Sequence, residues 1–236
     1  MKKFLYTIMS AVIVSGVFFS IGAKPNNSKV KYTVKETIEK NADGQEQYSI
    51  RYPVFEGAEQ LNAEIQKLTV HAYNEIADIK ASVEEEKTFT GVTPYYWLIF
   101  DFDKPIVSEN YISVLFCLGE YTGGAHGMTT SSGVTYNRKT KTIVSLEDIL
   151  LPKNKNWLKI LSQYCIRDLL KQSEQREGDF IAECNWVEEG AGENAENFTL
   201  FTIDDNGITV YFQEYQVWAY AYGTPSVKIP FSVFEK

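Results

Sequence analysis

A glycine-rich stretch near the middle of the chain holds one of its two histidines and is the segment best suited to chemistry. It reads Gly-Gly-Ala-His-Gly over residues 123–127, and hydroxyl side chains follow at Thr129, Ser131 and Ser132. A histidine can act as general base towards a hydroxyl nucleophile, as in serine hydrolases. Such a base also needs an orienting acid and an oxyanion hole, and neither has a recognisable signature here. We favour the alternative, in which the glycines allow positive φ or close backbone approach and His126 makes a local hydrogen bond.

Other catalytic arrangements have less support in the sequence. No Lys-Ser or Lys-Thr pair follows the glycines and no helical pattern begins at Gly127, which argues against a phosphate-binding loop. Carboxylate pairs for glycoside hydrolysis meet only in the folded chain, and Asp101, Asp103 and Glu120 are candidates by residue type alone. No catalytic residue is therefore assigned, and we predict that the protein is not an enzyme and uses no cofactor.

The three cysteines, Cys117, Cys165 and Cys184, have no CxxC spacing. With only His71 and His126 to join them, they do not support a zinc site, so no metal ligands are assigned. One disulfide at most can form among three thiols, and its pairing stays open.

The N-terminal residues have the pattern of a secretory signal peptide. Two lysines precede an apolar segment, 4–19, and small residues follow at 20–23, so cleavage after Gly22 or Ala23 fits. No cysteine follows that could carry a lipid. An uncleaved anchor is the alternative, because residues 4–23 are about long enough to cross a ~30 Å hydrocarbon core, but serines and glycines dilute the run. We predict a periplasmic or secreted protein that contacts the membrane only if this segment is retained.

The 236-residue chain is acidic, with a formal net charge of -8. Nucleic acid is an improbable partner, because phosphate binding requires a basic surface. The charge suits a cationic partner, and equally it suits plain solubility.

Two amphipathic helices are expected among many strands. The first covers about residues 58–86, with apolar residues at helical spacing, and His71 on it is a packing or surface residue. The second covers 157–172 and places Cys165 on its apolar side. An acidic, glycine-containing stretch, 188–197, is expected to be a mobile surface loop.

Strands with alternating or continuous β-prone residues fill most of the remainder. We expect a hairpin over 30–54, central strands at 94–102 and 111–121, a hairpin over 134–144, another over 198–212, and a last strand at 226–230. Consecutive hairpins with few helices predict an α+β fold with largely antiparallel sheet. We expect an N-terminal α+β half, 24–127, and a C-terminal α+β half, 128–236, packed as one compact unit after the signal peptide, 1–23.

Three motifs and the C-terminal pattern resemble an exported bacterial family. The motifs are Tyr121-Thr122-Gly123-Gly124-Ala125-His126-Gly127, Val134-Thr135-Tyr136-Asn137 and Ser145-Leu146-Glu147-Asp148-Ile149. The ending shares Phe198, Gly207, Tyr211-Phe212, Tyr215, Ala219-Tyr220-Ala221, Gly223, Val227 and Ile229-Pro230. Together they resemble the exported module of RsiV-type anti-sigma factors and PdaC-type peptidoglycan deacetylases. Glu214 and Ala219 stand where that family usually has proline.

The resemblance implies a non-catalytic binding module of the cell envelope, without sigma-binding or deacetylase parts. In the anti-sigma members this module binds lysozyme, so the expected partner is a cationic protein such as lysozyme or a cell-wall component. The alternative is an envelope enzyme or accessory domain acting on peptidoglycan. The residues expected to bind the partner are Tyr121, Gly123, Gly124, His126, Tyr215 and Tyr220.

Overall fold

The computed structural model of this chain describes residues 30–174 and 185–235. The expected signal peptide, 1–23, and Cys184 lie outside these residues. Within the described ranges, no helix is both long and apolar enough to cross a membrane.

The first part of the chain forms one seven-stranded sheet in the order β1-β2-β3-β5-β6-β7, with β4 paired beside β5. The strands are β1 (Tyr32–Lys40), β2 (Glu46–Phe55), β3 (Trp97–Phe102), β4 (Ile106–Val107), β5 (Tyr111–Tyr121), β6 (Met128–Asn137) and β7 (Thr142–Ile143). All neighbours are antiparallel except β2 and β3, which run parallel. The chain between those two is the helix α1 (Glu59–Thr90), because a parallel pair needs a long crossover.

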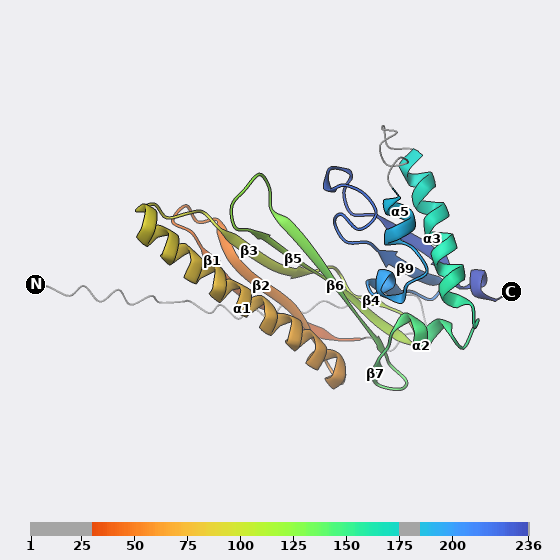
Figure 1. The fold of residues 1–236 in the computed structure, drawn as a ribbon. Coiled ribbons are helices and arrows are strands. Elements are labelled where there is room, and N and C mark those ends of the chain that lie inside the picture. The colour runs from red at the N-terminus through yellow and green to blue at the C-terminus, as the bar shows by residue number, and fades with distance from the viewer. Residues whose placement is uncertain (1–29, 175–184, 236) are drawn as a thin grey trace, which may run out of the picture.

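Helix α1 lies along one face of this sheet (Figure 1). Its apolar stripe is buried at Leu61, Ile65, Ala72, Ile76 and Ile79, as the helical spacing predicts. It packs in one core with β-strand residues such as Phe100, Val114 and Phe116. The helix runs four residues past the expected end, because nothing before Gly91 breaks it; Gly91 ends it with a left-handed backbone, φ 74°.

The second part of the chain builds a three-stranded sheet, in the order β10-β9-β8, with helices packed against it. Its elements are α2 (Leu146–Leu150), α3 (Trp157–Glu174), α5 (Trp186–Gly190), η1 (Ala195–Phe198), β8 (Phe201–Ile203), β9 (Gly207–Tyr211), η2 (Tyr220–Tyr222), β10 (Ser226–Pro230) and η3 (Phe231–Phe234). The predicted second helix is confirmed as α3. The α+β class is also confirmed.

Cys165 is a core residue of α3, as its position on the apolar side predicts. It is fully buried, and burial, followed by the nearby charge of Asp168, raises the pKa of its thiol to about 12. Cys117 and Cys165 are both free thiols. At neutral pH the Cys165 thiol is therefore protonated and behaves as a small apolar side chain.

The two parts of the chain share buried contacts. The hydroxyl of Ser113 on β5 lies 3.0 Å from Thr135 Oγ1 and accepts a 3.0 Å hydrogen bond from the Ile203 backbone N–H on β8. At Gly133 on β6, an added Cβ would lie 3.3 Å from both Leu200 Cδ1 and the Phe201 carbonyl oxygen. The first sheet also continues through the boundary expected at 127/128, because β6 pairs with β5 along its length.

The segment 188–197 lies at the surface, as expected, with Glu188, Glu189 and residues 193–196 exposed, but it is not an irregular loop throughout. It contains the end of α5 and the start of η1, and Gly190 and Ala191 in it are buried. The Ser162 hydroxyl donates to the Ala191 carbonyl, and Gln216 Nε2 donates to the Gly190 carbonyl. The small residues that suggested a loop are there because the segment packs tightly against its neighbours.

Helix α2 begins with a capping box whose contribution should depend on pH. Asp148 accepts hydrogen bonds from the Ser145 backbone and hydroxyl, which lower the pKa of its carboxyl below the ordinary 3.8. Because the folded-state pKa is below the unfolded one, this stabilisation is complete above about pH 4 and is lost as the pH falls through the folded value. We expect Asp148→Ala to cost about 1 kcal/mol at neutral pH and less near pH 3.

Urea unfolding at the two pH values measures this difference. Glu147→Ala is the matched control, because this neighbouring acid is exposed and lies outside the capping box. An equal loss at both pH values would contradict the role of the ionised carboxylate.

Candidate functional site

The hairpin between β5 and β6 ends in the glycine-rich loop. Gly123 and Gly124 have φ values of 101° and 97°, a region that side chains with a Cβ rarely enter. The Tyr121 hydroxyl donates to the Gly124 carbonyl across the loop at 3.0 Å, and the Tyr121 ring stacks near Trp97, with centroids 6.5 Å apart. The two glycines and Tyr121 therefore set the shape of the loop, as expected for a structural turn.

His126 is exposed at the tip of this loop and is bonded to backbone. Its Nδ1 lies 2.7 Å from the Gly127 carbonyl oxygen, so this nitrogen carries a proton and donates. The predicted local hydrogen bond is thus confirmed. The other ring nitrogen, Nε2, stays available to a partner.

Three aromatic rings from two distant segments stack together. The His126 ring lies on the Tyr220 ring, with centroids 4.3 Å apart and an interplanar angle of 8°. Tyr215 lies on the same ring at 6.1 Å and 24°. Tyr215 and Tyr220 are 45% and 38% exposed, so the stack faces solvent. We call His126, Tyr215 and Tyr220 the aromatic surface.

The aromatic surface is held in place by two residues that sequence reasoning missed. Gln213 Oε1 accepts from the Ser131 N–H at 3.0 Å, while its Nε2 donates to the Ser131 carbonyl at 2.6 Å. Glu214 Oε2 accepts from the Thr129 N–H at 3.1 Å. Both side chains thus bond the outer edge of β6. Their polar character suggests only a loop, so no sequence signal would have found them, although Glu214 replaces a usual proline.

Tyr215 itself has an unusual backbone. Its φ is 64°, one of two positive values at non-glycine residues in the described chain. Such conformations are costly and persist where neighbours hold them, often at functional sites. Here the bonds of Gln213 and Glu214 fix the residues immediately before Tyr215.

Three carboxylates lie near the thiol of Cys117 on β5. Cys117 is exposed, but partial desolvation by its neighbours, and then the charges of Asp103, Asp101 and Glu214, raise the pKa of its thiol. We call these three carboxylates the acidic patch; one of them, Asp101, is also paired with Arg51 at 3.4 Å.

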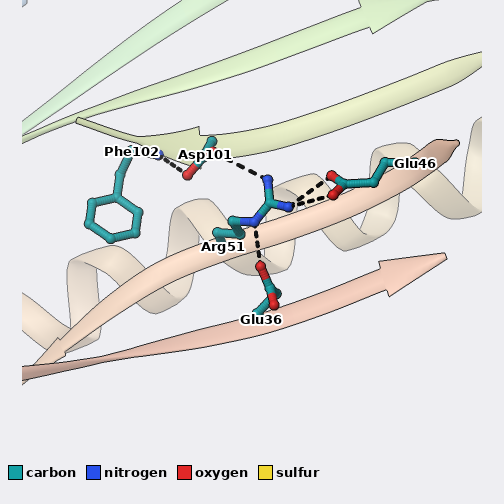
Figure 2. A network of polar contacts seen from close by, with 5 residues as sticks. All are labelled: Glu36, Glu46, Arg51, Asp101 and Phe102. Atoms are coloured by element: carbon teal, nitrogen blue, oxygen red, sulfur yellow. Dashed lines mark hydrogen bonds and ion pairs between the residues drawn. The ribbon is translucent and has the colours of Figure 1, made fainter. Parts of the chain in front are cut away.

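Further along the same sheet, Arg51 on β2 links three carboxylates (Figure 2). Its guanidinium bonds Glu36 on β1 and Glu46, 2.8 Å away, and lies 3.4 Å from Asp101 on β3. Burial lowers the pKa of the Arg51 guanidinium. The hydrogen bonds to Glu36 and Glu46 and the charges of Glu46 and Asp101 raise it by more, so the net shift of the pKa is upward. The guanidinium thus joins strands β1 to β3 and stays charged.

Two family models match two separate segments of the chain, and the aromatic surface takes residues from both. Residues 38–129 match the family described as deacetylase PdaC, and residues 147–232 match the protein family of unknown function DUF3298. The chain thus has one segment that matches the PdaC model and another that matches the DUF3298 model. The resemblance to PdaC-type proteins is therefore confirmed. His126 comes from the PdaC-type segment, while Tyr215 and Tyr220 come from the DUF3298 segment.

A curated relative aligns with nearly the whole chain. It is the peptidoglycan-N-acetylmuramic acid deacetylase PdaC of Bacillus subtilis, 25% identical over 246 residues, which cover 99% of this chain and 50% of the relative. The chain thus spans about half the length of this relative. The prediction that the protein is not an enzyme is contradicted by this match, because a relative along the full chain bears the name of a deacetylase.

Two solved structures share the fold of this chain. A DUF3298 family protein from Pseudomonas aeruginosa aligns with a TM-score of 0.58 at 17% identity, covering 86% of this chain and 91% of its own. A DUF3298 member from Bacteroides fragilis aligns with a TM-score of 0.50 at 18% identity, covering 94% and 93%. At these identities the match concerns the fold alone.

Proposed function

We propose that this chain is a recognition module of the bacterial cell wall, located outside the cytoplasmic membrane. Its aromatic surface binds a cationic wall-associated protein of the lysozyme type. The observation that carries the proposal is the solvent-facing stack of His126, Tyr215 and Tyr220, assembled from both family segments.

The aromatic surface has the properties of an interaction hot spot. Tyrosine supplies a large contact area at low conformational cost, and it is enriched among residues that dominate binding energy. The stack is already formed in the unbound chain, since Gln213 and Glu214 hold its base. Preorganisation of this kind reduces the entropy lost on binding.

Charge supports a cationic partner over an acidic one. The chain carries a net charge of -8, and Glu214 of the acidic patch immediately precedes Tyr215 of the aromatic surface. Complementary charge accelerates association and makes it sensitive to salt. Lysozyme is the partner that the family resemblance suggests, and the curated relative acts on the same polymer that lysozyme cleaves.

A binding measurement with lysozyme tests this proposal. We expect retention of lysozyme at low salt, weaker retention as ionic strength rises, and binding at least about tenfold weaker for Tyr220→Ala. Tyr73→Ala is the matched control, because this tyrosine on α1 is similarly exposed, at 40%. No retention of lysozyme at low salt would refute the proposal, as would equal losses in the two variants.

A second candidate function is a direct action on peptidoglycan, as the name of the Bacillus relative suggests. His126 is the residue to test, because its Nε2 faces away from the Nδ1 hydrogen bond and could exchange protons with a substrate. We would abandon this candidate if the parent protein and His126→Ala were equally inert on cell-wall substrates.

A further inference from the structure

A groove opens on the other face of the sheet, between α1 and the ends of β5 and β6. It has a volume of about 210 Å³. Its lining comprises Leu68, His71 and Glu75 from α1, Phe100 from β3, Phe116, Leu118 and Glu120 from β5, and Thr130 and Ser132 from β6. The groove exists because α1 covers the sheet only in part, so it leaves the polar end of β6 open.

The floor of this groove is apolar. Phe100 and Phe116 are 3% and 1% exposed and stack in parallel, with centroids 5.4 Å apart and an interplanar angle of 4°. Leu68 and Leu118 are partly exposed beside them. A ligand seated here would therefore rest an apolar surface on these side chains.

The rim of the groove carries polar groups that lack partners in the chain. Within residues 30–174 and 185–235, the Glu120 carboxylate has neither a cation nor a hydrogen-bond donor. The Thr130 and Ser132 hydroxyls likewise have no hydrogen bond with any other described residue. On the opposite rim, the Glu75 carboxylate lies 3.6 Å from His71 Nδ1. Two carboxylates and two hydroxyls thus surround an apolar floor.

We propose that this groove binds an amino sugar that carries a free ammonium group. The ammonium pairs with the carboxylates of Glu120 and Glu75, and the hydroxyls of Thr130 and Ser132 bond the sugar hydroxyls. The C–H face of the pyranose ring packs on the partly exposed side chains of Leu118 and Leu68. A volume of about 210 Å³ lies below the ~300–1,000 Å³ of pockets for drug-sized ligands, so one monosaccharide unit is a suitable occupant.

An amino sugar fits this groove because the lining combines carboxylates, hydroxyls and apolar side chains. A carboxylate pair alone would suit any cation, but a metal ion would leave the apolar floor without a contact. An alkylammonium would cover the floor but leave both hydroxyls without a partner. An N-acetylated sugar would place a neutral amide against two carboxylates. A sugar with a free amine satisfies the floor, the hydroxyls and the acids together.

An NMR titration of the full chain tests this proposal, with methyl signals of Leu68 and Leu118 as reporters. Glucosamine is the probe, and N-acetylglucosamine and n-butylammonium are the comparison ligands. We expect glucosamine to shift both methyl signals, with an apparent Kd at least about fivefold lower than either comparison ligand. Binding of N-acetylglucosamine or n-butylammonium as tight as that of glucosamine would overturn the proposal.

Glutamate-to-glutamine variants test whether glucosamine binds in this groove. Glu120→Gln is expected to weaken glucosamine binding at least about fivefold, because it removes a charged acceptor and keeps the shape. Glu64→Gln on α1 is the matched control, since this carboxylate pairs with Lys67 at 2.7 Å and does not line the groove. Equal affinity of Glu120→Gln and the parent would refute the proposal. The result is independent of lysozyme binding, because the aromatic surface contributes no residue to this groove.

Discussion

Replacement of Gly190 by alanine is expected to lower the free energy of unfolding by about 3 kcal/mol or more. A Cβ at this position would lie 2.0 Å from the Gln216 carbonyl oxygen and 2.9 Å from Val217 Cγ1. The obstacle is backbone, which cannot rotate away as a flexible side chain can. The Gln216 side chain also donates to the Gly190 carbonyl, so the two segments are tied at this contact.

Chemical unfolding monitored by tryptophan fluorescence measures this loss. Gly119→Ala is the matched control, because its added Cβ would lie 3.4 Å from the Trp97 ring, an ordinary contact. We expect the control to lose less than about 1 kcal/mol. If both variants were equally stable, the close approach of Gly190 to Gln216 would not exist in solution.

Truncation of Phe116 to alanine is expected to cost about 3–5 kcal/mol, because it opens a cavity in the core between α1 and the sheet. Phe116 is 1% exposed and packs against the rings of Phe100, at 5.4 Å, and Phe102, at 6.2 Å. Both the buried area and the ring contacts are lost together.

The same substitution at Phe89 provides the control for Phe116→Ala. Phe89 lies in the last turn of α1 and is 91% exposed, so Phe89→Ala should change stability by less than about 0.5 kcal/mol. Urea midpoints of the two variants compare them directly. A loss at Phe89 as large as that at Phe116 would show that burial does not set these costs.

Elements with strong periodicity could be predicted from the sequence. The apolar stripe of α1 and the buried side of α3 repeat at helical spacing over many residues, so local pattern and tertiary packing agree there. The hairpins with clear turn residues, such as the β8–β9 turn at residues 204–207, were recovered for the same reason.

Features that depend on contacts between distant segments could not be predicted. The composition of 188–197 is that of a loop, yet Gly190 has no room for a side chain because the Gln216 backbone approaches it, and the Ala191 carbonyl accepts from Ser162. The candidate site shows both cases. The loop glycines and His126 are visible in the sequence, but the stacking of His126 on Tyr220 joins residues that are far apart in the chain.

The bonds of Gln213 and Glu214 to β6 have a consequence for the behaviour of the protein in solution. The outer edge of β6 presents backbone N–H and C=O groups at Thr129 and Ser131, and these side chains occupy them as a neighbouring strand would. An unprotected sheet edge is a template on which other chains aggregate. The C-terminal loop that carries the tyrosines therefore also shields the sheet against self-association at high concentration.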